Sequence, residues 1–165
     1  MVTRPYEYQN LDGKDRRVLQ LVQRDGALSQ AEIAKKVGLS TAAVNERLRK
    51  LEASGVIRRW TALVRPEAVG ASITAFVEVF IENPKYETGF LKRVAELNEI
   101  QECHHVTGEF SLLLKVRVRD MESLQRLLLE QLAAHEGVRQ TRTVMVLSTV
   151  KEETYVEPTA RGGEA

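Results

Sequence analysis

The segment from Ser29 to Gly55 constrains the fold most strongly, because its pattern specifies two short helices joined by a tight turn. Ser29 with Glu32 three residues later forms a capping box, which predicts the start of a helix. Gly38 can adopt the left-handed conformation that ends a helix, and Ser40 can cap the next one. Two apolar stripes occur at helical spacing, formed by Ile33, Ala34 and Val37 and then by Val44, Leu48 and Leu51. The segment therefore predicts a helix-turn-helix.

The second of these helices, over residues 40–50, has an outward face suited to nucleic acid. Small residues at its start allow close approach to base edges; Asn45 can then pair with adenine and Glu46 can accept from cytosine. Arg49 and Lys50 are better placed for phosphates. The residues expected to contact DNA are Ser29, Gln30, Ser40, Thr41, Ala42, Ala43, Asn45, Glu46, Arg49 and Lys50. The alternative is a solvated helix face, since two-helix corners also occur in proteins that bind no DNA.

The charge of the chain is divided unevenly along its length. Residues 1–65 hold 13 Lys and Arg against 7 Asp and Glu, whereas residues 66–165 hold 11 against 16. The small net charge of +1 therefore hides a basic first third and an acidic remainder. A basic segment that carries a helix-turn-helix is typical of a DNA-binding module, whose affinity would fall with salt.

Composition limits the remaining classes. With 165 residues, 43% of them hydrophobic and 28% charged, the chain has room for one ordinary domain or two small ones. No apolar run reaches the length of a membrane span, and the N-terminus has no signal-peptide pattern. The single cysteine, Cys103, excludes an intrachain disulfide framework. We therefore expect a soluble cytoplasmic protein without membrane association.

The first domain is expected over residues 11–65, after an N-terminal arm at residues 1–10. A first helix should begin at Asp12 and end at Asp25-Gly26, so that it braces the other two. Residues 56–64 are rich in β-branched and aromatic side chains, which predicts a wing or a connecting strand. Arg58 and Arg59 on that strand could reach the DNA backbone, or could equally be only solvated.

The second half alternates between strand and helix periodicity, in the order β-α-β-β-α-β. The fold class is thus α+β: a winged helix-turn-helix followed by a ferredoxin-like domain over residues 66–152, with both helices on one face of the sheet. Residues 153–165 read as a disordered tail. The expected elements are strand 71–82, a helix carrying Tyr86 to Leu97, strand 100–107, a tight turn at Gly108-Glu109, strand 110–118, a helix from Asp120 to Gly137, and strand 138–150.

One face of such a sheet is left without helices. Phe76 and Phe80 would lie on that face, where exposure of large apolar side chains to water is unfavourable. We therefore expect the face to be buried against a second copy of the chain. A homodimer would also present two recognition helices to two half-sites.

The chain resembles the Lrp/AsnC family of leucine-responsive, or feast/famine, transcriptional regulators over roughly residues 11–152. The resemblance rests on the segments LDGKDRRVLQLVQRDGALS, AEIAKKVGLSTAAVNERLRKLEASGVI, RPEAVG, CHHVTGEFSLLLKVRV and GVRQTRTVMVLSTVKE. Membership would imply a ligand-sensing second domain and dimers that assemble to tetramers, octamers or higher forms on double-stranded DNA. It would also imply bending or wrapping of that DNA, and an effector, an amino acid or related small metabolite, bound between dimers.

The resemblance also locates an effector site. The family site lies near the turn after the second strand of the sheet and on its last strand, which here corresponds to Val106, Thr107, Gly108, Glu109, Phe110, Thr141 and Thr143. Turn amides and threonine hydroxyls can hold a carboxylate, while Glu109 or Glu136 could meet an ammonium. The family turn ordinarily ends in Asp, and this chain has Ser111 there. The alternative is a plain hairpin glycine with strand-forming threonines.

Cys103-His104-His105 invites a metal or catalytic interpretation. Successive strand residues face opposite sides, and no metal-ligand spacing accompanies them, so we expect no metal site, no cofactor and no enzyme. The alternative function is decarboxylation of a modified haem precursor, because such decarboxylases resemble this family in fold and use histidines in the same part of the sheet. The basic first domain argues against that alternative, and a standalone sensing module does not account for the complete helix-turn-helix.

Overall fold

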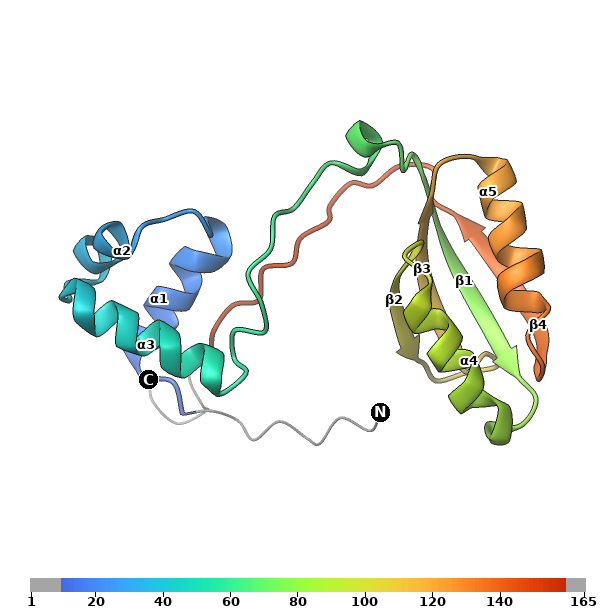
Figure 1. Cartoon of the computed structure of the whole chain (residues 1–165), viewed down its shortest axis with the longest axis horizontal. Helices are drawn as coiled ribbons and strands as arrows, with labels where there is room; N and C mark the ends of the chain where they lie inside the picture. Colours follow the sequence, from blue (N-terminus) through green and yellow to red (C-terminus); the bar gives the residue numbers. More distant parts are fainter. Residues whose placement is uncertain (1–9, 160–165) are drawn as a thin grey trace. The chain divides into compact units, whose positions relative to one another are not determined.

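Residues 10–159, which the computed structural model describes, fall into two units (Figure 1). The first unit combines the chain up to Ala62 with the C-terminal segment that starts at Glu152. The second unit runs from Leu63 to Lys151. The expected arm at residues 1–10 lies outside the described residues except for Asn10.

The described part of the first unit contains three helices, and each begins at a side chain that caps it. The Asp12 carboxylate accepts from the Asp15 amide at 2.7 Å, and the Ser29 hydroxyl accepts from the Glu32 amide at 3.2 Å. Ser40 caps the third helix through the Ala43 amide at 3.1 Å. The expected helix starts at Asp12, Ser29 and Ser40 are confirmed. The helices are α1 (Gly13–Arg24), α2 (Gln30–Val37) and α3 (Thr41–Ala53).

The turn between α2 and α3 has the conformation that its glycine predicts. Gly38 lies in the left-handed region with φ 66°, and the Leu39 amide donates to the Ala34 carbonyl at 3.1 Å. The core of this unit consists of Val18, Leu19, Val22, Ile33, Ala34, Val37, Val44, Leu48 and Leu51. The helix-turn-helix is therefore confirmed, with the predicted apolar stripes turned inward.

Arg47 ties α3 to the start of α1. Its Nη1 atom lies 2.7 Å from Asp12 Oδ2 and 2.6 Å from Asp15 Oδ1, and its side chain is 28% exposed. The hydrogen bonds to Asp15 and Asp12 raise the pKa of Arg47 above its already high ordinary value. Arg47 thus orients the helix from its inner side.

The strand expected over residues 56–64 is wrong. No helix or strand occurs from residue 58 to residue 65 of the described chain, and the local contacts are made back to α3. The Ile57 amide donates to the Leu51 carbonyl at 3.0 Å, and Trp60 Nε1 donates to Glu52 Oε1 at 2.5 Å. β-branched residues favour an extended backbone, but a strand also requires a hydrogen-bonded partner.

The second unit is a four-stranded antiparallel sheet in the order β2-β3-β1-β4. This order confirms the ferredoxin-like βαββαβ arrangement. A short 3-10 turn, Pro66–Val69, precedes the sheet. The elements are β1 (Ile73–Ile81), α4 (Pro84–Glu96), β2 (Ile100–His105), β3 (Leu112–Val118), α5 (Met121–Arg126) with its π-helical continuation Leu127–Ala133, and β4 (Val138–Met145).

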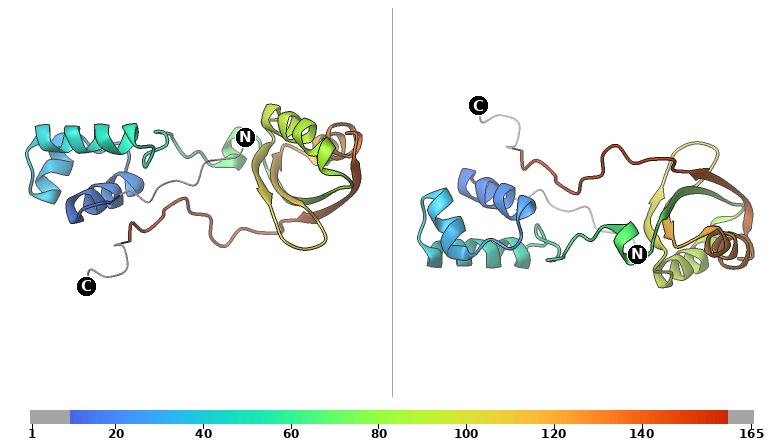
Figure 2. Two further views of the ribbon diagram at one scale, coloured as in Figure 1. Left: turned by 90° about the horizontal axis from the view of Figure 1, so that it is seen from below. Right: turned by 90° about the horizontal axis from the view of Figure 1, so that it is seen from above.

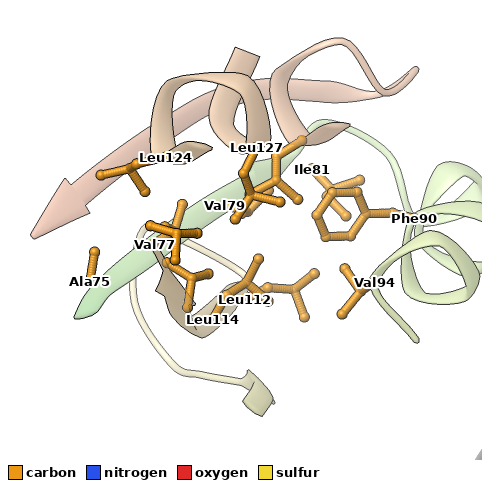
Figure 3. Close-up of a cluster of buried hydrophobic side chains, with 13 residues drawn as sticks. Ala75, Val77, Val79, Ile81, Phe90, Val94, Leu112, Leu114, Leu124 and Leu127 are labelled. Carbon is orange, nitrogen blue, oxygen red and sulfur yellow. The ribbon is translucent and has the colours of Figure 1, made fainter. Parts of the chain in front are cut away.

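Both helices cover the same face of this sheet (Figure 2). The alternation in β1 turns Ala75, Val77 and Val79 toward them, each with 0% exposure. Phe90 of α4 and Leu124 and Leu127 of the α5 helix close the other side of the core (Figure 3). The expected division of this strand between a helix-covered face and a face that carries Phe76 and Phe80 is confirmed.

Several boundaries of the second unit differ from the sequence expectation, most of all in β2, in β4 and in the β2–β3 connection. β2 ends at His105 and β4 at Met145, so both strands are shorter than predicted. Residues 106–111 form a longer connection in place of a two-residue turn, closed by the Val106 amide on the Ser111 carbonyl at 3.0 Å. The Ser111 amide donates to the Val79 carbonyl of β1 at 3.1 Å, so Ser111 is hydrogen-bonded both to Val106 and to β1.

The C-terminal segment is ordered as far as residue 159 where disorder was expected. The Gln23 side chain of α1 both donates to the Val156 carbonyl and accepts from the Val156 amide, each at 2.9 Å. Gln20 donates to Glu157 at 2.6 Å, and the guanidinium of Arg24 lies 5.3 Å from the centre of the Tyr155 ring. The expectation failed because these partners lie more than 130 residues away in the sequence. Residues 160–165 of the tail lie outside the described residues.

Replacing Arg47 with methionine should lower the free energy of unfolding of the first unit. Methionine keeps the length and helix propensity of the side chain but removes both ion pairs, and we expect a decrease of about 1–2 kcal/mol. Trp60 is the sole tryptophan and belongs to this unit, so its fluorescence during urea unfolding reports the change. Arg17→Met is the control, since Arg17 is exposed on α1 and bonds to the neutral side chain of Gln20 at 3.1 Å. Equal stability of the two variants would contradict the role of Arg47.

Candidate functional site

The predicted DNA-contacting residues are gathered at the surface of α2 and α3. All ten are exposed except Ala43, which is half-buried at the start of α3. Ser29 and Ser40 cap the two helices, so the start of each helix presents polar groups. Gln30 Nε2 donates to Asn45 Oδ1 at 3.3 Å, which joins the first residue of α2 to the outward face of α3. These residues therefore form one continuous polar face.

Glu46 is paired with both of the cations that follow it on α3. Arg49 donates from Nε to Glu46 Oε2 at 3.1 Å and from Nη2 to Oε1 at 3.0 Å. Lys50 Nζ lies 3.5 Å from the same Oε1. The hydrogen bond from Arg49 lowers the pKa of Glu46, so the carboxylate stays charged at neutral pH. Helical periodicity places Glu46, Arg49 and Lys50 on one face, but it does not by itself reveal that their side chains bind one another.

The loop that contains Gly108 is open to solvent on its outer side. Val106 to Glu109 are exposed, whereas the Phe110 side chain at the end of the loop is buried, with 6% exposure. Gly108 has φ 122°, and no atom lies within 4 Å of the position that a Cβ would occupy. The loop therefore offers backbone groups and the Glu109 carboxylate to a small ligand.

Arg142 is the β4 side chain that lies beside this loop. Its guanidinium carbon lies 5.1 Å from the centre of the Phe110 ring, and it forms an ion pair with Glu78 of β1. The hydrogen bond that Arg142 Nε donates to Glu78 raises the pKa of Arg142 and lowers the pKa of Glu78. Sequence reasoning missed Arg142, although the alternation of β4 places it on the face opposite to the two predicted threonines.

Thr141 and Thr143 lie on the other face of the sheet. In the β1–β4 register they are opposite Val79 and Val77, which face the helices. The structure therefore does not bring the threonine side chains to the same face as Arg142. Glu136 is exposed in the connection between the α5 helix and β4, where its backbone carbonyl oxygen lies 2.9 Å from His135 Nδ1.

The face of the sheet without helices carries the two phenylalanines that were predicted there. Phe76 and Phe80 are half-buried, and Phe76 is paired across the sheet with Val144 of β4, which is 50% exposed. Leu113 of β3 is opposite Glu78 and shares this face. These apolar side chains thus flank Glu78, while its partner Arg142 lies on the edge strand β4.

Cys103, His104 and His105 are divided between the two faces of β2, as predicted. His105 Nε2 lies 3.0 Å from Glu87 of α4, whereas His104 Nε2 lies 3.2 Å from Glu102. Burial raises the pKa of the Cys103 thiol, which lowers its reactivity. Across residues 10–159, no three His, Cys, Asp or Glu side chains gather in a way that could hold a metal ion.

Comparison with known proteins assigns both units. A family model described as a winged helix-turn-helix DNA-binding domain matches residues 11–58, and the Lrp/AsnC ligand binding domain matches residues 74–156. The leucine-responsive regulatory protein of Escherichia coli K12 is 43% identical over 145 residues, which cover 87% of this chain and 88% of that protein.

Solved structures agree with these matches. A transcriptional regulator of Neisseria meningitidis in complex with L-methionine superposes with a TM-score of 0.85 at 32% identity, covering 88% of this chain and 96% of that one. A feast or famine regulatory protein of Mycobacterium tuberculosis with L-methionine gives 0.82 at 33% identity, with coverage of 89% and 99%. AsnC of Escherichia coli gives 0.83 at 26% identity, with coverage of 92% and 100%.

The fold and the matched domains define a two-domain DNA-binding transcriptional regulator. The chain belongs to the Lrp/AsnC family. This result confirms the resemblance, the fold class and the regulatory function that the sequence predicted. Within the described residues no helix is both long and apolar enough to cross a membrane.

Proposed function

We propose that this regulator reads duplex DNA through the outward face of α3, and that an amino acid or a related small metabolite modulates its action. The observation that carries the proposal is the exposed polar face from Ser40 to Lys50, held outward by three buried residues on the opposite side of the same helix. Small residues in the first turn would admit base edges, and the cations at the far end would contact phosphates.

We also propose that the chain is not an enzyme and acts in the cytoplasm. Its relatives carry the names of transcriptional regulators. The two β2 histidines lie on opposite faces, each beside a different glutamate, which does not favour the alternative decarboxylase. A DNA-binding protein with a single cysteine fits a reducing compartment.

The proposed assembly is a homodimer formed through the helix-free face of the sheet, with larger forms built from such dimers. Phe76, Phe80, Leu113 and Val144 supply the apolar surface. Glu78 is already neutralised by Arg142, which lies on the edge strand β4 and is 60% exposed, so the dimer contact leaves no lone carboxylate while Arg142 stays at its rim. A dimer would present two α3 helices to a pseudo-palindromic site.

The proposed effector site is the loop from Val106 to Phe110 together with Arg142. An amino acid carries a carboxylate and an ammonium; Arg142 and the turn amides suit the former, and Glu109 suits the latter. Two structural neighbours hold L-methionine, which makes that amino acid the first one to test. Thr141, Thr143 and Glu136 would contribute less directly, since the threonines face the helices.

Removing the two cations at the end of α3 should weaken binding to every DNA sequence. For Arg49→Ala with Lys50→Ala, the slope of log K against log salt should become shallower by about 0.9 for each phosphate that the protein no longer neutralises. Electrophoretic mobility shifts at several salt concentrations measure both effects. Lys92→Ala with Arg126→Ala removes the same charge from exposed positions of the second unit and is the control. Equal behaviour of the two double variants would refute the orientation assigned to α3.

A charge on the helix-free face of the sheet should dissociate the dimer. Phe80→Glu would place a carboxylate in an apolar interface, and we expect the dimer to weaken by about tenfold or more in Kd. Sedimentation velocity of the full chain over a range of concentrations measures the change. Met121→Glu charges an apolar residue that is 59% exposed on α5, over the other face, and should leave the dimer intact. A stable Phe80→Glu dimer would rule out this interface.

Removing the guanidinium beside the loop should weaken effector binding. For Arg142→Gln we expect the Kd for L-methionine, measured by isothermal titration calorimetry, to rise by about tenfold to a hundredfold, because a charge-assisted hydrogen bond is no longer made. Arg139→Gln alters an exposed arginine of the same strand and should bind as the unaltered protein does. Equal affinities of Arg142→Gln and Arg139→Gln would exclude Arg142, and failure of L-methionine and a panel of other amino acids to bind at all would exclude the effector proposal.

A further inference from the structure

Arg49 and Lys50, the two cations that we assign to DNA phosphates, are already paired with Glu46 in the free protein. Arg49 makes a two-point contact with Glu46 at 3.0 and 3.1 Å, and Lys50 lies 3.5 Å from the same carboxylate. The side chains are 48% exposed for Glu46, 68% for Arg49 and 70% for Lys50. One carboxylate therefore sits between two positive charges on the surface that is to meet DNA.

Glu46 is the only acid in the first ten residues of α3. The next acid, Glu52, accepts from Trp60 Nε1 at 2.5 Å, and the remaining cation of the helix, Arg47, is held by Asp12 and Asp15 on the inner side. Every charged side chain of α3 thus has a partner, and only the cluster of Glu46, Arg49 and Lys50 lies on the outward face. Pairs spaced three and four residues apart also stabilise a helix slightly, but that contribution would arise on any face of it.

We propose that Glu46 is a specificity-determining residue, which competes with DNA phosphates for Arg49 and Lys50 and so disfavours sequences that offer its carboxylate no donor. The proposal rests on the DNA-binding role of α3 proposed above. In the free protein Glu46 holds Arg49 and Lys50, and in the complex its carboxylate accepts from a base or is left without a donor.

The physical reason is a difference between right and wrong DNA sequences. To reach phosphates, Arg49 and Lys50 must leave Glu46, and its carboxylate then lies in a groove of strongly negative potential. At a suitable site a cytosine amino group can donate to the carboxylate and offset that cost. At other sites no donor is available, so the repulsion remains and the complex is weaker.

The test compares Glu46→Gln with Glu52→Gln in the full-length chain. Both variants remove one negative charge from α3, but only the first frees Arg49 and Lys50. The probes are a genomic fragment selected by the unaltered protein and a mixed-sequence duplex without that site. Binding is measured by fluorescence anisotropy from about 50 to about 300 mM salt, and a thermal unfolding curve of each variant verifies that the helix is intact.

For Glu46→Gln we expect affinity for the mixed-sequence duplex to rise about two- to fivefold at low salt, the range set by exposed ion pairs. Affinity for the selected fragment should change less, so the ratio of the two affinities falls. The advantage should shrink as salt rises, because salt screens the exposed pair in the unaltered protein. Glu52→Gln should change both affinities by less than about twofold.

Equal gains for the two variants would show that only net charge matters and would overturn the proposal. An unchanged affinity for the mixed-sequence duplex in Glu46→Gln would overturn it as well. Both results leave the DNA-binding role of α3 standing, provided that Arg49→Ala with Lys50→Ala still weakens binding. Failure of the unaltered protein to bind either probe would instead reject the proposed function itself.

Discussion

The packing of one side of α3 determines what the rest of the first unit can do. Val44, Leu48 and Leu51 are buried against α1 and α2, and this contact fixes the rotation of the helix about its axis. Arg47 adds a polar restraint on the same inner side through Asp12 and Asp15. Once the inner side is set, the residues that face outward follow from 3.6 residues per turn. The polar face of α3 is thus a consequence of the core beneath it.

In the second unit, too, the buried side of an element fixes what its other side presents. Here the element is a strand, in which side chains alternate between the two faces of the sheet. The alternation of β1 sends Val77 and Val79 toward the helices and Phe76 and Phe80 to the opposite face. The antiparallel register then carries that division to β4, where Arg142 shares the phenylalanine face and the threonines share the helix face. One sheet therefore separates a core that stabilises the fold from a surface to which we assign the proposed dimer contact and Arg142 of the proposed effector site.

Charge acts on two scales in this protein. Over the whole first third, the excess of basic residues would attract DNA at long range, and this attraction falls off with salt. At the surface of α3, however, the availability of a cation depends on the acid beside it, and Glu46 engages two of them. A count of charges predicts association with DNA, whereas selectivity depends on which pairs must break when DNA arrives.

The sequence by itself determined the capped starts of α1, α2 and α3, the turn at Gly38 and the order of strands and helices in the sheet. These features depend on neighbours three or four residues away, or on an alternation along one strand. The tertiary structure alone decided that Arg142 reaches Phe110, that residues 56–64 find no strand partner, and that the C-terminal segment packs on α1. Each of these features depends on groups that are distant in the chain. Such groups come into contact only when the hydrophobic core of each unit has formed.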